Sequence, residues 1–326
     1  MRSLLDRHES KLQVAGHETF PCRYGWLKKS YDAVRSEIMT EPDGRQHAFS
    51  PNTAIADFGV GKNMVASMRH WALACGVLQP VGERLGRLEL LEPTALGELI
   101  FGSSDPYLEL PSSVWILHWR LAALPGRATT WYYAFNEFND PVFTKDTLAE
   151  RLWTRLDELR ETGKLTNNRI AKATVARDAE CLVRTYVTRG QRRKGIEDGL
   201  ESPFTELGLL TPMAGGALQF RRGPKPTLSD KVFGFALLEF WAGQFGSRGA
   251  LSVETIAHEP GSPGRVFLLD EDSLVERLER IEDFTGGMLS WDEGGGLRQV
   301  TRRLAFDKVD PLRLLVSLYA PLEKAA

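Results

Sequence analysis

The sequence is poor in cysteine. Cys22, Cys75 and Cys181 are its three cysteines among 326 residues, and they lie far apart. No CxxC pair is present, which argues against a structural zinc site or a dithiol redox motif. We therefore expect three reduced thiols in a hydrophobic core, as is usual in the cytoplasm.

Long hydrophobic runs are also missing. No stretch approaches the roughly eighteen apolar residues of a membrane-spanning helix. The N-terminal stretch MRSLLDRHESKLQV is charged throughout and lacks the apolar segment of a signal peptide. The sequence thus predicts a cytoplasmic protein without membrane contact.

The chain has no overall excess of charge of one sign, because its formal net charge is −2. The charge is distributed unevenly, however: residues 145–194 carry 13 Lys and Arg against 7 Asp and Glu, which leaves −8 for the remainder. Such an asymmetry is typical of a segment that faces nucleic acid, and it also occurs on an ordinary solvated helix face.

Motifs for nucleotide binding and for common nucleases are missing as well. The stretch GVGKN resembles part of a P-loop, but Ala56 stands at the first glycine position and Asn63 follows Lys62. We expect no nucleotide or organic cofactor. No convincing PD-(D/E)xK, HNH-like, HxxxH or DxD arrangement of metal ligands is found.

The composition is that of a globular protein, with 42% apolar and 26% charged residues. The length favours two or three domains. We expect a mainly α, α+β protein with an N-terminal DNA-binding region (1–105), a helical core with a second helix-turn-helix (106–198) and a C-terminal α+β domain (199–326).

The stretch GHETFPCRYGWLKK, residues 16–29, begins the first predicted helix. Thr19 and Pro21 are typical of a helix start, and Leu27, Tyr31, Val34 and Ile38 follow helical spacing. Three interpretations stay open. In a catalytic one, His17 is a base or metal ligand, Glu18 binds metal and Arg23 clamps a phosphate; in the others, the cluster caps the helix or binds phosphate without catalysis.

Residues 53–93 predict the order of a winged helix. A short helix at 53–58, a tight turn and a helix at 62–75 precede a predicted hairpin with a Gly-containing turn. On the second helix, Met64, Val65, Met68, Trp71, Ala72 and Cys75 fall within an arc of about 120°. The opposite arc and the wing supply the predicted DNA contacts Lys62, Asn63, Arg69, His70, Arg84 and Arg87. A protein–protein module is the alternative.

The middle of the chain predicts a buried centre followed by a basic surface. Residues 111–143 are dense in aromatic side chains, and His118 among them is expected to be a core histidine rather than a ligand. After a helix from about 145, Asn167 or Asn168 caps a second helix whose apolar face includes Val175, Leu182 and Tyr186. Its other side and the following loop supply the predicted phosphate contacts Arg169, Lys172, Arg177, Arg184, Arg192, Arg193 and Lys194.

The C-terminal third alternates short elements. We expect a helix at 228–242, a short strand at Val266–Leu269, a charged helix at 272–283 and a hairpin within 288–300. Asp270, Glu271 and Asp272 lie at the start of the charged helix, where acidic side chains favour the helix dipole.

Several segments together resemble the SspB-like family, which was formerly catalogued as a domain of unknown function. They are GHETFPCRYGWLKK, SPNTAIADFGVGKNMV, LHWRLA, WYYAFNEF, RDAECLVRTYV, EDGLESPFTELGLL, GSPGRVFLLDE and GGGLRQV. The family is encoded beside genes for single-strand DNA phosphorothioation, in which sulfur replaces a non-bridging phosphate oxygen. The resemblance covers nearly the whole chain.

The resemblance implies a component of a bacterial DNA sulfur-modification and defence system that nicks duplex DNA. It implies a cysteine desulfurase, an ATP-dependent sulfur-transfer enzyme and an ATPase as partners, besides double-stranded DNA. Phosphodiester cleavage usually needs acidic ligands and a divalent ion, so Mg²⁺ or Mn²⁺ is the expected cofactor. A homodimer stays open, because many DNA-binding proteins pair about a two-fold axis.

A protein of another class also fits the sequence. A non-enzymatic adaptor or transcription regulator would bind DNA and recruit the modification enzymes, and the missing nuclease motifs favour it. A scaffold that binds only proteins is a third alternative.

Overall fold

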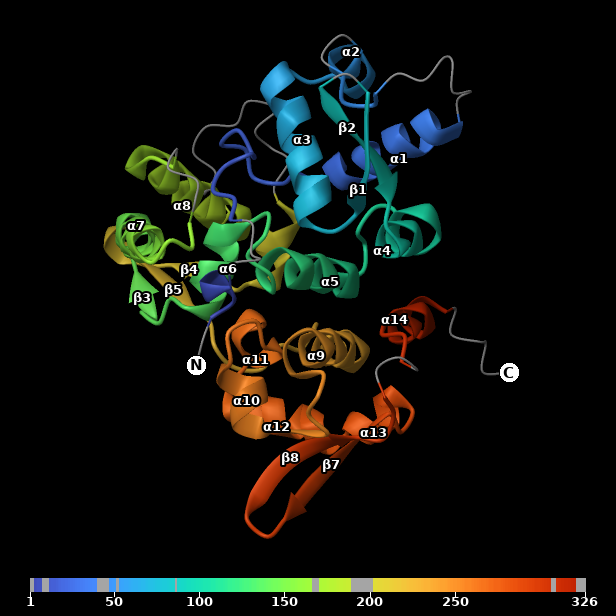
Figure 1. Ribbon diagram of the computed structural model, residues 1–326, viewed down its shortest axis with the longest axis vertical. Coiled ribbons are helices and arrows are strands. Elements are labelled where there is room, and N and C mark those ends of the chain that lie inside the picture. Colours follow the sequence, from blue (N-terminus) through green and yellow to red (C-terminus); the bar gives the residue numbers. More distant parts are fainter. Residues whose placement is uncertain are drawn as a thin grey trace.

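The structure is a computed structural model and describes residues 3–7, 12–39, 47–50, 53–85, 87–165, 170–188, 202–305 and 309–320. It is a mixed α+β protein, rich in helix, with three small antiparallel sheets in the order β1-β2, β3-β5-β4 and β6-β8-β7 (Figure 1). Its elements in chain order are η1 (Leu4–Asp6), α1 (Trp26–Met39), α2 (Ala54–Phe58), α3 (Lys62–Ala74), β1 (Leu78–Leu85), β2 (Leu88–Pro93), α4 (Ala95–Gly97), η3 (Glu98–Ser104), α5 (Pro111–Ala122), α6 (Thr129–Asn136), β3 (Val142–Phe143), α7 (Lys145–Glu161), α8 (Lys172–Tyr186), η5 (Pro203–Leu207), β4 (Leu210–Pro212), η6 (Ala214–Gly216), β5 (Leu218–Phe220), α9 (Asp230–Phe245), β6 (Ala250–Ser252), α10 (Val253–His258), α11 (Pro263–Val266), α12 (Glu271–Glu279), α13 (Ile281–Thr285), β7 (Leu289–Gly294), β8 (Leu297–Arg302) and α14 (Leu312–Tyr319).

The N-terminal part contains the predicted succession of helix, turn, helix and hairpin in α2, α3, β1 and β2. Helix α3 buries Val65, Met68 and Trp71 as its periodicity predicts, and α1 packs against it. Helix α1 begins at Trp26 rather than near Thr19, because Thr19 has a left-handed backbone with φ of 67°. Its predicted core residue Ile38 is 39% exposed.

The centre is built from the aromatic segment, as expected. Helices α5 and α6 are buried on nearly all faces. His118 is a core residue: its two ring nitrogens contact the Tyr186 hydroxyl at 2.8 Å and the Val266 carbonyl at 2.9 Å. The cysteines are free and buried, which confirms their predicted place in the core.

Helices α7 and α8 pack against each other but do not form a tight helix-turn-helix. Helix α7 ends at Glu161 and α8 begins at Lys172, which leaves a connection longer than the three- to four-residue turn of that motif. The predicted second helix-turn-helix is therefore replaced by a helical hairpin. Asn167 and Asn168, the predicted caps, lie outside the described residues.

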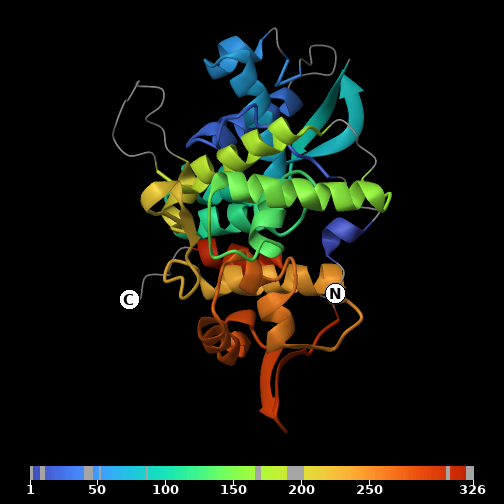
Figure 2. The same cartoon turned by 90° about the vertical axis from the view of Figure 1, so that its left-hand side faces the viewer.

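The C-terminal part combines α9–α13 with the third sheet, and the β7–β8 hairpin projects from the body at the end opposite α2 (Figures 1 and 2). The predicted hairpin and the predicted helix at α9 are confirmed. The predicted strand Val266–Leu269 is wrong. The Ser262 hydroxyl caps the short helix α11, and Leu268 has a φ of +52°, which is incompatible with a regular strand.

The three predicted regions share a core, and the second and third also share a sheet. Strand β3 from the second region pairs with β5 from the third, with Val142 opposite Gln219 and Phe143 opposite Leu218. Buried apolar residues form a continuous cluster from Leu4 to Leu315. The division at 105 and 198 stays a prediction. In the described part of the chain, no helix is long and apolar enough to cross a bilayer.

Candidate functional site

The start of α3 presents two of the predicted DNA contacts to solvent. Lys62 and Asn63 are exposed in its first turn, directly after the N-cap residue Gly61. The N-terminus of a helix carries a partial positive charge, which the Lys62 ammonium reinforces. This end of α3 therefore has the electrostatics of a phosphate contact.

The β1–β2 hairpin carries mixed charge. Arg84 and Arg87 are exposed, as expected for a wing, but Arg84 lies opposite Glu89 in the strand register. The side chains of Gln79 and Glu92 are joined by a hydrogen bond of 2.8 Å. The two arginines are thus available to a partner within a surface that is not uniformly basic.

His70 is not on the outer face of α3, which corrects the sequence prediction. It is only 7% exposed, and its ring makes an edge contact with Trp71. Burial, together with the charge of the neighbouring His17, lowers the pKa of His70 to about 3. The N-terminal segment covers this part of the polar arc of α3, because Gln13 Nε2 lies 3.5 Å from His70 Nδ1. His70 is therefore a neutral core residue, unsuited to reading bases.

Arg69 is half-buried, and burial together with the like charge of Arg127 lowers its pKa. On α8, Lys172 and Arg177 are exposed as predicted. Arg184 instead turns toward the N-terminal segment, where its Nη1 donates to the Thr19 carbonyl at 3.0 Å. The remaining predicted basic contacts lie outside the described residues: Arg169, Arg192, Arg193 and Lys194.

His17 is buried in a hydrogen-bonded cluster that joins three parts of the chain, the N-terminal segment, α6 and α8. His17 and Asp178 are each 2% exposed. The Thr19 amide donates to His17 Nδ1 at 3.0 Å, so the ring proton is on Nε2, which donates to Asp178 Oδ1. The same carboxylate accepts from the Ala15 amide at 2.9 Å and from the Thr130 hydroxyl.

This arrangement favours the architectural interpretation of His17. Both ring nitrogens are engaged inside the protein, and the ring stacks on Trp71 with a centroid separation of 6.2 Å. A general base needs an open nitrogen within reach of the substrate proton. The carboxylate that His17 contacts is that of Asp178 and not that of Glu18, its neighbour in the sequence.

Glu18 and Arg23 do not converge on His17. Glu18 is exposed and has a left-handed backbone with φ of 47°. Arg23 is buried, with its guanidinium 5.7 Å from the ring centroid of Phe20 and 5.4 Å from that of Trp26. The three residues proposed as a catalytic group therefore lie in three different environments.

Gly16 makes the close packing of this cluster feasible. Its φ is +121°, a conformation that residues other than glycine rarely adopt. A Cβ at this position would lie 2.5 Å from His70 Nδ1 and 2.6 Å from Gln13 Nε2. Gly16 is thus required for two reasons: its backbone has a positive φ, and the neighbouring side chains leave no room for a Cβ.

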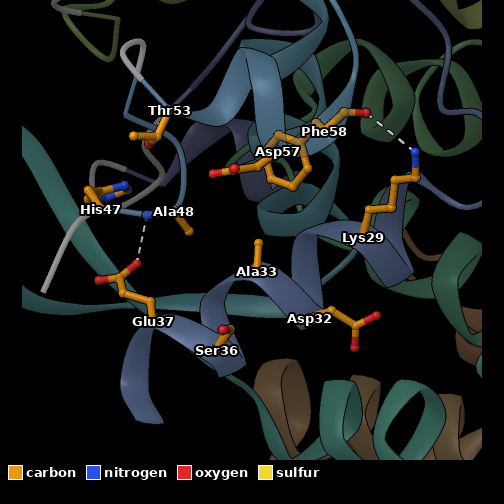
Figure 3. A pocket seen from close by; sticks show the side chains of 10 residues that line it. All are labelled: Lys29, Asp32, Ala33, Ser36, Glu37, His47, Ala48, Thr53, Asp57 and Phe58. Atoms are coloured by element: carbon orange, nitrogen blue, oxygen red, sulfur yellow. Dashed lines mark hydrogen bonds between the residues drawn. The ribbon is translucent and has the colours of Figure 1, made fainter. Parts of the chain in front are cut away.

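A separate cavity of about 620 Å³ lies beside α2, between α1 and residues 47–48 and 53–58 (Figure 3). Lys29 Nζ donates to the Phe58 carbonyl at 3.4 Å, and the Ala48 amide donates to Glu37 Oε2 at 2.9 Å. Asp32, Glu37 and Asp57 line it, but Figure 3 shows their carboxylates pointing in different directions. In the described part of the chain, no group of three His, Cys, Asp or Glu side chains is arranged to hold a metal ion. These residues present no preformed magnesium cage.

Comparison with known proteins places the chain in a family. Residues 14–318 match the family described as "Protein of unknown function (DUF4007)". The chain belongs to this family. Its fold is similar to a "Magnesium ion-bound SspB crystal structure", with a TM-score of 0.81 and 30% identity over 98% of this chain and 90% of that one. A second "SspB crystal structure" gives a TM-score of 0.79 and 31% identity over 97% and 90% of the two chains. No curated protein matches.

The resemblance to the SspB-like family is thereby confirmed over nearly the whole chain. Sequence reasoning nevertheless missed Asp178 and Thr130, the partners in the His17 cluster. The available signal was Asp178 itself, an acidic residue that falls on the otherwise apolar face of α8 between Val175 and Leu182. A carboxylate on a buried face requires a polar partner.

Proposed function

We propose that this protein is a DNA-binding component of a DNA phosphorothioation system and that it nicks duplex DNA. The observation that carries the proposal is the similarity to SspB structures, which extends through 98% of the chain at 30% identity. The SspB-like family is associated with single-strand DNA phosphorothioation. The desulfurase, the sulfur-transfer enzyme and the ATPase of such a system are the proposed protein partners.

In this proposal, the α2–α3 unit and the β1–β2 hairpin bind DNA as a winged helix. Lys62 and Asn63 approach the duplex from the start of α3, and Arg84 and Arg87 contact phosphates from the hairpin. Arg69 supports them from a half-buried position. Lys172 and Arg177 on α8 contact the DNA backbone further along the duplex. The predicted basic residues outside the described ranges contribute to the same contact. The exposure of Lys62, Asn63, Arg84, Arg87, Lys172 and Arg177 supports this assignment.

Magnesium or manganese is the proposed cofactor of nicking. One SspB structure is described as magnesium ion-bound, which supports a divalent ion in the family. Mg²⁺ is commonly held by one or two carboxylates together with substrate phosphates rather than by a protein cage. A site completed by bound DNA is therefore compatible with the scattered carboxylates of this chain.

The test is relaxation of a supercoiled plasmid by the purified protein with Mg²⁺ or Mn²⁺ over a range of salt concentrations. We expect open circles that disappear with EDTA. If no open circle forms under any of these conditions, the nicking claim is wrong. If the same preparation binds duplex DNA tightly, the DNA-binding part of the proposal would still stand.

A non-enzymatic adaptor is the second candidate, and it is favoured by the lack of a metal-binding cluster among the described residues. It predicts specific duplex binding together with nicking activity that separates from the protein during further purification. Co-elution of nicking with the protein through two different columns would exclude this candidate.

A further inference from the structure

A cavity of about 390 Å³ opens beside the β3-β5-β4 sheet. One wall is the connection between α6 and β3, and the other is the end of β5 with the residues that follow it. The pairing of Val142 with Gln219 fixes the two walls relative to each other. The volume lies within the range of about 300–1,000 Å³ that is usual for small-molecule sites.

The cavity has an aromatic floor and a polar wall. The buried rings of Phe135 and Phe138 both pack against Phe220, with centroid separations from it of 5.5 and 6.4 Å. The polar groups around it include the side-chain amides of Asn139 and Gln219. The site therefore combines a rigid apolar base with hydrogen-bonding groups.

Two arginine side chains line this cavity, and a third contacts one of its lining residues. Arg221 and Arg222 line it, and Arg222 Nη1 donates to the Leu269 carbonyl at 3.4 Å. Arg265 of α11 does not line the cavity, but its Nη2 donates to Asn139 Oδ1 at 2.9 Å and to the Asn136 carbonyl. Within the residues that the structure describes, none of the three forms an ion pair with a carboxylate, and the buried Nε of Arg265 has no hydrogen-bond partner.

The surroundings disfavour the charged form of two of these side chains, Arg222, which is exposed overall, and Arg265. Burial lowers the pKa of Arg222, and burial together with the positive charge of Arg222 lowers the pKa of Arg265 to about 10. Asp140 also lines the cavity, but its carboxylate lies 4.0 Å from the guanidinium of Arg151 on α7. A bound anion would offset the repulsion between Arg222 and Arg265 and would give the guanidinium groups of Arg221 and Arg222 a charged acceptor.

We propose that this cavity binds a nucleoside monophosphate unit, with its phosphate held by Arg221 and Arg222. Paired planar guanidinium groups match the oxygens of a phosphate. The volume exceeds what a lone phosphate fills, and the space over the phenylalanine floor and beside the Asn139 and Gln219 amides takes the sugar and base.

The unit is the phosphate-bearing end of a DNA strand, a choice that rests on the proposed nicking function. A nick creates a strand end, and a terminal nucleotide enters a concave site more easily than an internal one with neighbours on both sides. A free nucleotide has the same chemistry and is the other source to be tested.

The experiment measures binding of hexathymidylate, labelled at its 3′ end, to the full-length protein by fluorescence anisotropy. The 5′-phosphorylated oligonucleotide should bind at least tenfold more tightly than the 5′-hydroxyl form. Arg221→Glu and Arg222→Glu should each remove this difference, and Asp140→Asn should strengthen binding of the phosphorylated form. Arg313→Glu on α14 makes the same charge change elsewhere and should have no effect. A 3′-phosphorylated, 5′-labelled oligonucleotide identifies which end is preferred.

Thermal unfolding checks that the variants are folded, and Arg222→Lys provides a milder change that keeps the charge but loses the planar fork. Thymidine 5′-monophosphate that competes as strongly as the phosphorylated oligonucleotide supports the site with a free nucleotide as occupant. Equal binding of all oligonucleotides, unchanged in folded Arg221 and Arg222 variants, overturns the proposal. Plasmid nicking measured on the same preparations separates the two proposals: arginine-dependent end binding without nicking rejects only the proposed nicking function.

Discussion

The imidazole of His17 donates a hydrogen bond from Nε2 to the carboxylate of Asp178, across 161 residues of sequence. Through the additional bonds of Asp178 to the Ala15 amide and the Thr130 hydroxyl, this contact joins the N-terminal segment to α6 and α8. The most distinctive segment of the sequence is thus anchored to the central core.

Asp178→Ala should destabilise the protein by about 3 kcal/mol or more, because it leaves three buried donors without an acceptor at about 1–3 kcal/mol each. Urea unfolding at pH 7 measures the change. Glu150→Ala, an exposed position on α7, should stay within about 0.5 kcal/mol of the parent. An Asp178→Ala variant as stable as the Glu150→Ala control would contradict the anchoring role.

His17→Ala should keep duplex affinity and nicking when it is measured at a temperature where the variant is folded. The reason is that both nitrogens of His17 are engaged within the protein. Circular dichroism verifies the fold, and the plasmid assay measures nicking. A folded His17→Ala protein that binds DNA but does not nick it would restore the catalytic interpretation.

Gly16→Ala should destabilise the protein more than Gly25→Ala. Both glycines have positive φ, but a Cβ at Gly16 meets His70 and Gln13 within 2.6 Å, whereas a Cβ at Gly25 meets nothing within 4 Å. Backbone strain costs about 1–3 kcal/mol, and at Gly16 the clash adds to it. Chemical denaturation of the two variants side by side compares them; equal losses would mean that His70 and Gln13 move aside freely.

Stability should fall as the pH drops below about 6.5, the ordinary pKa of histidine. Burial lowers the pKa of His118 to about 4 and that of His70 to about 3. The unfolded chain therefore binds protons that the folded protein does not. Between the pKa of the unfolded chain and that of the folded protein, each histidine lowers the free energy of unfolding by about 1.4 kcal/mol for every pH unit of acidification. The stabilising effect is fully present above pH 6.5 and is lost toward the folded pKa.

His70→Gln isolates one of these contributions. Asp178, His17, Arg69 and Arg127 surround His70 electrostatically and remain in the variant. The difference in unfolding free energy between parent and variant should shift in favour of the variant from pH 7 to pH 5. A constant difference over this range would show that His70 does not titrate on unfolding.

Lys62→Glu and Arg177→Glu should each weaken duplex binding and flatten its salt dependence by about one unit in the logarithmic plot, because each residue contributes about one phosphate contact. Fluorescence anisotropy of a labelled duplex at several salt concentrations measures both effects. Arg313→Glu serves as the control of equal charge. Unchanged affinity in both variants would favour a scaffold that does not contact DNA.

The features that the sequence predicts correctly are those that depend on local patterns of residues. The periodicity of α3, the β1–β2 and β7–β8 hairpins and the buried aromatic helices α5 and α6 all follow from spacing and turn residues. Val266–Leu269 was misassigned because a short apolar run fits a buried strand and a buried turn equally well. His70 was misplaced because helical periodicity does not show which other segments cover a helix.

The sites depend on contacts that are distant in sequence. Asp178 meets His17 only after the chain has folded back, and the arginine-lined cavity brings Asn139 close to Arg222 and Arg265. No local spacing encodes either arrangement. The sequence shows an excess of basic residues at 145–194, whereas Arg221, Arg222 and Arg265 lie outside that segment.

The pairing of β3 with β5 has a consequence for how the chain folds during synthesis. The ring of Phe143 lies 4.9 Å from that of Phe220, and Phe138 contacts the same ring. A nascent chain that has emerged only as far as residue 198 contains β3 but not its partner strand, so the rings of Phe138 and Phe143 lack their contacts with Phe220. Closing such a long loop is entropically slow. The interval before β5 emerges is therefore when this protein most needs the protection of a chaperone.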